Sequence, residues 1–506
     1  MTDLNDIILT FSVEEQQKFT VYLEKKNKRT DIKNIKLFNM LLIDELDSKT
    51  ICKKLYGTEK HNAYYALRKR LHESVIDFTA NQRLQEEGSV EMQIIKYILA
   101  SKSFLQQKQF KVAYKILEKA ENLAIEHSLF PLLNEIYHTK IQYAYANPFI
   151  ELEPLIIKFK NNQKSILLED ELNIIYTKIR KTINNMSFKG EVLDFQTILE
   201  TTFKAHQITI NDGMSFKSLY QLVTISSISA FVTKDYLKIE PFLINTYKSI
   251  LKHKNKEKQS FYHIQILYAI ANTLFRNKKF DESLSYLEIM HEHMQLKNQK
   301  HYKTFKLKYH LLWALNLNYS NKQELAISAL TPFTHKKHDD MESLLDIHLS
   351  LIVFYFQRNE FKKAHHIFSK FYHTDKWYIE KAGQEWVIKK NLIEILLHIE
   401  LYNIDLVESR LQSFKRLYFP YLKNINQERV ITFLSFVEAY YKNPKTTTSK
   451  AFIEKVEKSF EWVGTYREDI FVMSFYSWLK SKMNNTNLFT TTLNLIAQSE
   501  KEINNI

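Results

Sequence analysis

Cys52 is the only cysteine of the chain and its most reactive type of side chain. A thiol becomes a nucleophile when a nearby charge or histidine lowers its pKa. The residues beside Cys52 are apolar and basic, and the sequence indicates no histidine partner for it. We therefore expect a buried, inert thiol. A lone cysteine forms no intramolecular disulfide, which suits a reducing cytoplasm.

Histidines offer the next candidate chemistry. His335 and His338, followed by Asp339, place two imidazoles one helical turn apart. Zinc needs four ligands, or three and an open position, and the sequence supplies no others nearby. His291 and His293 are two residues apart and point to different faces of a helix, so they cannot chelate one ion together. We expect no metal site.

Catalytic motifs are absent as well. The chain contains no GxxxxGK, GxGxxG, HExxH or GxSxG pattern. Its 506 residues include only 6 glycines, which leaves little material for a phosphate-binding loop. The sequence therefore predicts no catalytic residue and no cofactor, and favours a protein that is not an enzyme.

The shortage of turn-forming residues decides the fold class. With 6 glycines and 7 prolines, the chain lacks the material for the tight turns of β-sandwiches, barrels and doubly wound sheets. An all-α fold remains. Most turns must then be made by Asn, Lys, Asp and Ser, as in FRNKKFDES and FQRNEFKKA.

Large and small residues recur with one spacing along the chain. The three clearest copies are Tyr97, Ala100, Ser101, Phe104, Phe110, Ala113, Leu117 and Ala120; Leu267, Ile270, Ala271, Leu274, Phe280, Ser283, Leu287 and Met290; and His348, Leu351, Ile352, Tyr355, Phe361, Ala364, Phe368 and Phe371. This pattern resembles the tetratricopeptide repeat, in which small residues let two antiparallel helices approach. The resemblance implies a right-handed α-solenoid of helical hairpins with a concave face for a ligand.

Weaker copies give the array its period and limits. The position that the repeat gives to the small residue of the second helix falls at 113, 239, 283, 326, 364 and 407, about 42 residues apart once two degenerate units are placed between 120 and 220. Pro148 and Pro154 fall where the first of these units would turn. We predict an array over residues 89–506, with a capping region from about residue 445.

The concave face of such an array is the predicted partner-binding groove. If the repeat register holds, the exposed first-helix positions can grip an extended peptide or a partner helix. Close packing of neighbouring helices would instead cover them. These positions are Tyr268, Asn272, Phe275, Lys308, Leu311, Leu349, Val353 and Phe356.

Residues 1–88 do not follow the repeat and are predicted to form a separate helical domain. Helices are expected at 11–23, 37–45, 49–56 and 62–84, with Ser48 as an N-cap and Gly57 as a terminator. The short and long helices around Gly57 look like a helix-turn-helix element, whose basic residues would contact nucleic acid. The candidate contacts are Lys53, Lys54, Arg68, Lys69 and Arg70.

The charge distribution weighs against that interpretation. The whole chain has a net charge of +14, but residues 1–88 hold 15 Lys and Arg against 14 Asp and Glu. A DNA-binding domain normally concentrates its positive charge. A capping or partner-docking role for the N-terminal helices is the other interpretation, and charge spread over helical faces also serves solubility.

Two segments suggest a broader resemblance, one over residues 11–86 and one near the end of the chain. They resemble a group of uncharacterised helical-repeat proteins of Bacteroidota-type bacteria. The first segment contains FSVEEQQKFTVYLEKKNKR, KLYG and LRKRLHESVIDF, and the second is EDIFVMSFYSWLKSKM. That group implies the same architecture and a bacterial cytoplasm, without a known activity. The start of the chain is acidic and no apolar stretch reaches the ~20 residues of a membrane span.

The sequence thus predicts a cytoplasmic, all-α scaffold that binds a protein or peptide partner. The alternative is a regulator that contacts nucleic acid through its N-terminal helices and uses the array as a sensor or oligomerisation platform. Formation of a homo-oligomer is left open.

Overall fold

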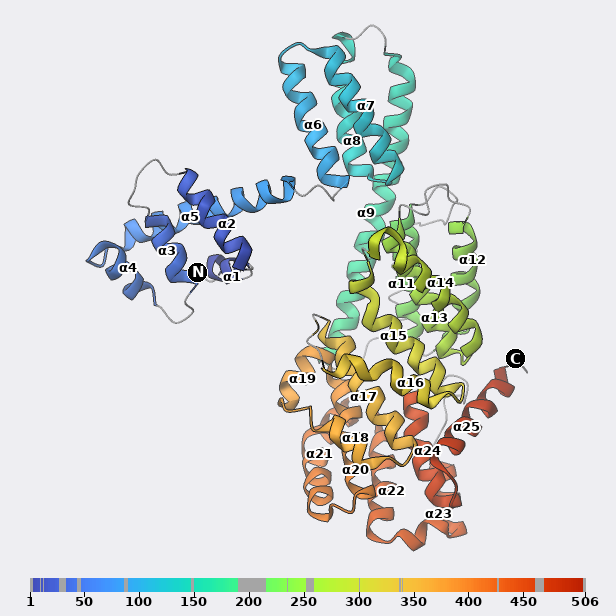
Figure 1. Cartoon of the computed structure of the whole chain (residues 1–506). Helices are drawn as coiled ribbons and strands as arrows, with labels where there is room; N and C mark the ends of the chain where they lie inside the picture. The colour runs from blue at the N-terminus through green and yellow to red at the C-terminus, as the bar shows by residue number, and fades with distance from the viewer. Residues whose placement is uncertain are drawn as a thin grey trace. The chain divides into compact units, whose positions relative to one another are not determined.

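A computed structural model describes residues 3–9, 11, 13–26, 33–42, 47–85, 90–146, 150–189, 215–233, 235–251, 259–299, 301–335, 338, 340–425, 427–459 and 468–503. Over these residues the chain is helical and contains no strand (Figure 1). The prediction of an all-α protein is confirmed. No helix in the described ranges has both the length and the apolar character needed to cross a membrane.

The chain divides into two compact units, residues 1–163 and 164–506. The first unit contains α1 (Asp3–Leu9), α2 (Val13–Lys26), α3 (Lys33–Leu41), α4 (Ser48–Tyr56), α5 (His61–Gln85), α6 (Val90–Gln106), α7 (Phe110–Glu126), α8 (Phe130–Gln142) and the 3₁₀ turn η1 (Ala144–Ala146). Helix α9 (Leu152–Lys189) begins in the first unit and continues into the second.

Helices α1 to α5 share an apolar core of their own. Phe19 and Phe38 meet edge to face with ring centroids 5.0 Å apart, and Phe78 of α5 packs on Phe19 at 5.1 Å. Cys52 is buried in this core, as expected. Gly57 ends α4 in the left-handed region, with φ of 72°. The N-cap is Asp47 and not Ser48, because the Asp47 carboxylate accepts the Thr50 amide hydrogen bond at 3.0 Å.

Helices α6 and α7 form the first predicted hairpin. Ala113, Leu117 and Ala120 of α7 are fully buried, as the repeat pattern predicts. The buried residues of α6 are Ile94, Ile98, Ser101 and Leu105. Tyr97 and Phe104, expected in the seam, are only half-buried, because the apolar stripe of α6 is set one residue from the expected one.

The two degenerate repeats expected between residues 120 and 220 are not found in the described part of that region. Helix α9 runs unbroken from Leu152 to Lys189 instead. Pro154 lies in its first turn, where a proline costs no hydrogen bond, and Pro148 lies outside the described residues. No glycine or proline follows until Gly190, so nothing in the sequence ends the helix earlier.

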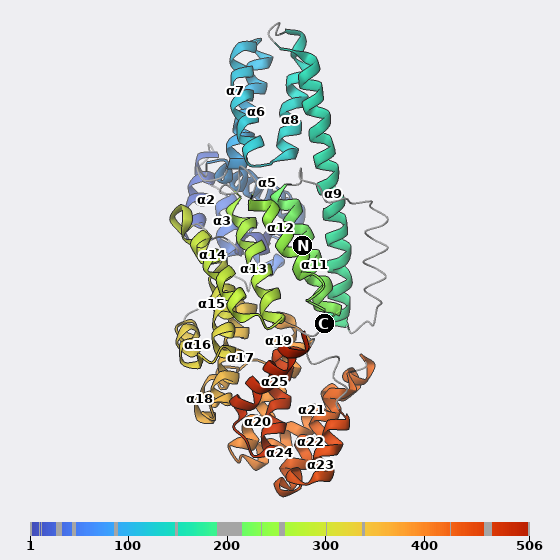
Figure 2. The same ribbon diagram turned by 90° about the vertical axis from the view of Figure 1, so that its right-hand side faces the viewer.

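The second unit packs its helices mainly in chain order (Figure 2). They are α11 (Phe216–Thr233), α12 (Glu240–Leu251), α13 (Ser260–Arg276), α14 (Phe280–Gln299), α15 (Tyr302–Tyr319), α16 (Gln323–Leu330), η2 (Thr331–His335), α17 (Met341–Gln357), α18 (Phe361–Phe368), α19 (Asp375–Ala382), α20 (Gln384–Glu400), α21 (Ile404–Asn424), α22 (Glu428–Lys442), η3 (Pro444–Thr448), α23 (Lys450–Ser459), α24 (Ile470–Asn484) and α25 (Leu488–Ile503).

The second repeat copy matches the structure best. All eight of its pattern residues, on α13 and α14, are buried in the core of this unit. Ala271 and Ser283 are fully buried, and the Ser283 hydroxyl donates a hydrogen bond to the Ala271 carbonyl at 2.8 Å. Their small side chains allow this close contact between the two helices.

Four turns of the second unit place a residue other than glycine in the left-handed region. Lys278, Asn321, Asn359 and Tyr402 have φ of 63°, 61°, 59° and 58°. In each turn the next amide bonds back to a carbonyl five residues earlier, as from Lys279 to Leu274 at 2.9 Å. This is the Schellman arrangement. The prediction that Asn and Lys replace glycine in these turns is confirmed in FRNKKF and FQRNEF.

Candidate functional site

The histidine candidates do not gather into a metal site. Among the described residues, no group of three His, Cys, Asp or Glu side chains is placed to hold an ion. Asp339 lies outside the described residues. His291 stacks on Tyr309 with ring centroids 4.9 Å apart, while the ring of His293 lies 4.1 Å from that of His263. The two therefore face different neighbours, as the spacing predicts.

The predicted nucleic-acid contacts lie on α4 and α5 of the first unit. Lys53, Lys54, Lys69 and Arg70 are exposed, whereas Arg68 is half-buried and donates a hydrogen bond to the Tyr64 hydroxyl at 3.4 Å. Lys53 forms an ion pair with Glu59 at 3.1 Å. Tyr65, with 41% of its surface exposed, lies one turn before Lys69 on α5.

Half of the predicted groove is closed. Phe275, Leu349, Val353 and Phe356 are each at most 5% exposed, so the prediction that they line an open face is wrong. The physical reason is packing on both sides: Phe275 contacts the rings of Phe280 and Tyr319, and Phe356 contacts Phe361.

The other half of the predicted groove is accessible. Lys308 is exposed, and Tyr268, Asn272 and Leu311 are partly exposed. They lie on α13 and α15, which contact each other. We call these four residues the open face.

Helix α24 and the two residues before it contact the carboxyl ends of α13, α15 and α17 and both halves of α20. Helices α22 and α25 and the turn η3 also pack on α24. We call the six residues of α13, α15, α17, α20 and the turn after α13 that make these contacts the α24 seat; they are Arg276, Lys278, Tyr319, Gln357, Lys389 and Glu400. They come from four hairpins that are far apart in sequence from α24. The predicted capping region therefore contributes a helix that packs along several hairpins.

The amino end of α24 meets positive charge. Arg276 forms an ion pair with Asp469, the N-cap of α24, and the Lys278 ammonium lies 3.4 Å from the Glu468 carbonyl oxygen. Arg429 of α22 donates to both carboxylate oxygens of Glu468, at 3.1 and 3.0 Å. Four backbone amides at a helix start lack partners, and Asp469 accepts that of Phe471 at 2.9 Å.

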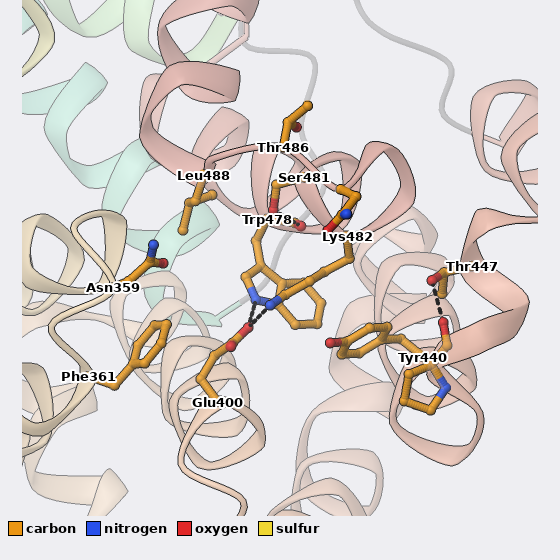
Figure 3. A pocket seen from close by; sticks show the side chains of 12 residues that line it. Asn359, Phe361, Glu400, Tyr440, Thr447, Trp478, Ser481, Lys482, Thr486 and Leu488 are labelled. Atoms are coloured by element: carbon orange, nitrogen blue, oxygen red, sulfur yellow. Dashed lines mark hydrogen bonds and ion pairs between the residues drawn. The ribbon is translucent and has the colours of Figure 1, made fainter.

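The middle and carboxyl end of α24 meet neutral and then negative groups. Gln357 donates to the Ser474 hydroxyl at 3.2 Å, and the Tyr319 hydroxyl lies 3.5 Å from it. At the other end, Glu400 accepts hydrogen bonds from Trp478 at 2.6 Å and from Lys482 at 2.7 Å (Figure 3).

A pocket of about 350 Å³ lies beside Glu400. Its lining residues come from α18, α20, α22, η3, α24, α25 and the turns beside them, and they include Tyr440, Trp478 and Lys482 (Figure 3). The Lys482 ammonium lies 5.8 Å from the Tyr440 ring centre and 5.9 Å from that of Trp478. The carboxylate and both rings thus surround a cation of the chain itself.

A second polar cluster lies near the amino end of α24. The Trp386 indole donates to the Asp346 carboxylate at 3.1 Å. Burial raises the pKa of Asp346 to about 6, the charge of Glu342 adds to this rise, and Lys389 opposes it. Burial also raises the pKa of Tyr268 to about 12, and the negative charge of Asp346 contributes to that rise. The Tyr268 hydroxyl and the Asp346 carboxyl are therefore shielded from water, while part of the Tyr268 side chain stays exposed on the open face.

The sequence interpretation missed α24 as an occupant of this surface. The sequence of this segment, EDIFVMSFYSWLKSKM, already indicated a buried helix. It begins with acidic residues and ends with basic ones, and between them a helix would carry apolar or aromatic residues on all of its faces. A helix that is apolar all round is buried. Indeed Met473, Phe475, Tyr476, Trp478 and Leu479 are all buried.

Comparisons with known proteins give no further guide. No protein-family model matches the chain, and neither the comparison with curated proteins nor that with solved structures found a match. The resemblances to tetratricopeptide repeats and to the bacterial helical-repeat group therefore stay predictions.

Proposed function

We propose that this protein is a non-enzymatic scaffold whose helical hairpins form a tetratricopeptide-like array and bind a peptide or a helix of a protein partner. The array would span residues 260–424. Its first helices, α13, α15, α17 and α20, begin at residues 260, 302, 341 and 384, close to the predicted period of about 42.

One observation carries the proposal. The ends of these four helices already hold a helix, α24, through side chains of the α24 seat. The contacts combine charged hydrogen bonds with aromatic packing, which is how grooves recognise amphipathic helices. The open face lies on α13 and α15 of the same array, and Tyr268, Leu311 and Lys308 offer a ring, an apolar side chain and a cation.

A capture experiment with the full chain tests this function. Tyr268→Ala and Leu311→Ser should each abolish retention of a bound partner, because both remove contact area from the open face; both side chains also pack against the core, so circular dichroism must show that each variant is folded. Leu325→Ser on α16, where Leu325 is 56% exposed, is the matched control and should retain the partner. Recovery of no partner, or of partners that are indifferent to both open-face variants, would sink the proposal.

A second candidate function rests on α4 and α5. The two helices are joined through Gly57, and α5 presents Tyr65, Lys69 and Arg70 to solvent. Lysines and arginines bind phosphates, and an exposed ring can stack on a base. We propose nucleic-acid binding by this surface as the alternative, and the salt dependence of binding by the full chain tests it.

A further inference from the structure

The α24 seat changes charge along its length. Arg276, Lys278 and Lys389 lie at the amino end of α24, the uncharged Tyr319 and Gln357 lie at its middle, and Glu400 lies near its carboxyl end. Helix α24 has the opposite order. Glu468 and Asp469 precede it, Ser474 lies in its middle and Lys482 lies near its end.

The register of α24 matches this order one turn at a time. Asp469 contacts α13, Ser474 contacts α15 and α17, and Trp478 and Lys482 contact α20. The contacting positions are four or five residues apart, about one helical turn. A helix that entered in the opposite direction would put its acidic end at Glu400 and its lysine at Arg276.

From this complementarity we infer that α24 is an internal ligand of the array, and that the partner is a helix of the same design. That partner helix carries an acidic residue at its amino end, an aromatic residue in the first turn and a lysine or arginine about 13 residues after the acidic one. It competes with α24 for the seat. The inference rests on the proposed function, because it names the chemistry of the partner.

Burial makes the seat selective for that pattern. In the seat, the side chain of Glu400 is 12% exposed and that of Arg276 is 30% exposed. When a bound helix covers a charged seat residue but offers no opposite charge, that residue loses its hydration without a compensating ion pair. This desolvation penalty weakens the binding of any helix whose charges are in a different order. Lys389 adds an aromatic requirement, since its ammonium lies 5.4 Å from the Phe471 ring centre.

A peptide-binding experiment tests the inference with the full chain. The probe is a fluorescent synthetic peptide with the sequence of residues 468–487. The full chain carries Asp469→Asn and Lys482→Met, which weaken the internal ligand while keeping an N-cap residue and the apolar stem. We expect the probe to bind this variant at least tenfold more tightly than the unmodified chain, in which α24 fills the seat.

Two controls define specificity. Adding Arg276→Met or Glu400→Gln should weaken probe binding at least tenfold. A probe with Glu468 and Asp469 both changed to lysine should not bind. Equal binding of both probes, or equal binding to both forms of the chain, would overturn the inference. A stable dimer that takes up no probe would also overturn the inference, because a second copy of the chain would then be the occupant of the seat.

A second experiment tests the inference even if the double variant does not fold. A protease site inserted between residues 459 and 468 of the full chain allows cleavage after folding. The separated α24 and α25 should exchange with the labelled peptide, and no exchange would contradict the inference. If the open-face variants lose their partner but no probe enters the seat, the proposed function stands and only this inference fails.

Discussion

Buried polar side chains link neighbouring hairpins at the residue scale. The Asn316 amide donates to the Ser283 hydroxyl at 3.0 Å and to the Leu312 carbonyl at 2.8 Å, and Ser283 donates to Ala271. Both polar residues are fully buried. A buried donor without its partner costs about 1–3 kcal/mol. The small residue that the repeat pattern requires at 283 thus also connects α13, α14 and α15.

His398 makes stability depend on pH. Its side chain is 5% exposed, and burial, helped by His365 and Arg410, lowers its pKa from 6.5 to about 4. Between these values the unfolded chain binds a proton that the folded chain does not, so lowering the pH favours unfolding. We expect His398→Gln to remove about 2 kcal/mol of the stability lost between about pH 7 and pH 5, as measured by urea denaturation.

The matched control is His366→Gln, because His366 is exposed on α18. It should leave the slope of stability against pH unchanged. Asp346 has the opposite effect on the pH dependence of stability. Because its pKa is raised from 3.8 to about 6, the folded chain keeps a proton that the unfolded chain has lost in this interval. The free energy of unfolding therefore falls as the pH rises through it. Identical slopes for His398→Gln and the unmodified chain would contradict the prediction.

Single residues also mark where sequence interpretation stops. The repeat spacing correctly placed Ala271, Ser283 and Ala364 in the core. It could not separate Val353, which is buried, from Leu311, which is partly exposed, since both are apolar residues on first helices. Which of the two is covered depends on the elements that pack on each helix, and the repeat spacing does not supply that information.

At the scale of elements, the turn after α20 contains a residue in an energetically unfavourable backbone conformation. Tyr402 adopts φ of 58° after α20, and 88% of its surface is exposed. A residue with a Cβ loses roughly 1–2 kcal/mol in the left-handed region, and the exposed ring gains little in return. Asn321 and Asn359 tolerate this region better.

Replacing Tyr402 with glycine should therefore stabilise the protein. We expect Tyr402→Gly to raise the free energy of unfolding by about 1 kcal/mol, since glycine occupies the left-handed region without strain. Tyr402→Ala keeps the Cβ and serves as the control, with no such gain. Chemical denaturation measures both, and a destabilised glycine variant would show that the ring makes a contact worth more than the strain.

Helix α9 shows the limit of a periodic pattern. The repeat positions 113 and 239 are 126 residues apart, which suggested two further repeats between them. The length of an interval does not show which secondary structure the intervening residues form. The absence of glycine and proline from 155 to 189 was the better indicator, and it agrees with the 38-residue helix. The N-terminal helices α2 to α5 were predictable because apolar stripes and Gly57 define them locally.

At the scale of the whole molecule, charge separates the two proposals. Residues 1–88 are nearly neutral in sum, so nucleic-acid binding there depends on a few exposed cations and not on a general positive field. Four phosphate contacts would make affinity fall about a hundredfold between roughly 50 and 200 mM salt.

This gives a direct test on the full chain. Fluorescence anisotropy with duplex DNA and with single-stranded RNA should show that salt dependence, and Lys69→Ala with Arg70→Ala should reduce binding at least tenfold. The matched pair Lys111→Ala and Lys115→Ala, exposed on α7, should have no effect. Flat or absent binding removes the nucleic-acid proposal.

The order in which the chain is synthesised gives the α24 seat a period without its internal ligand. Glu400 leaves the ribosome 82 residues before Lys482. At 5–20 residues per second this delay is roughly 4 to 16 seconds, longer than most helical hairpins need to form. During that time the proposed array is complete as far as α20, while α24 does not yet exist. A partner helix present at the site of translation would meet the seat before its competitor.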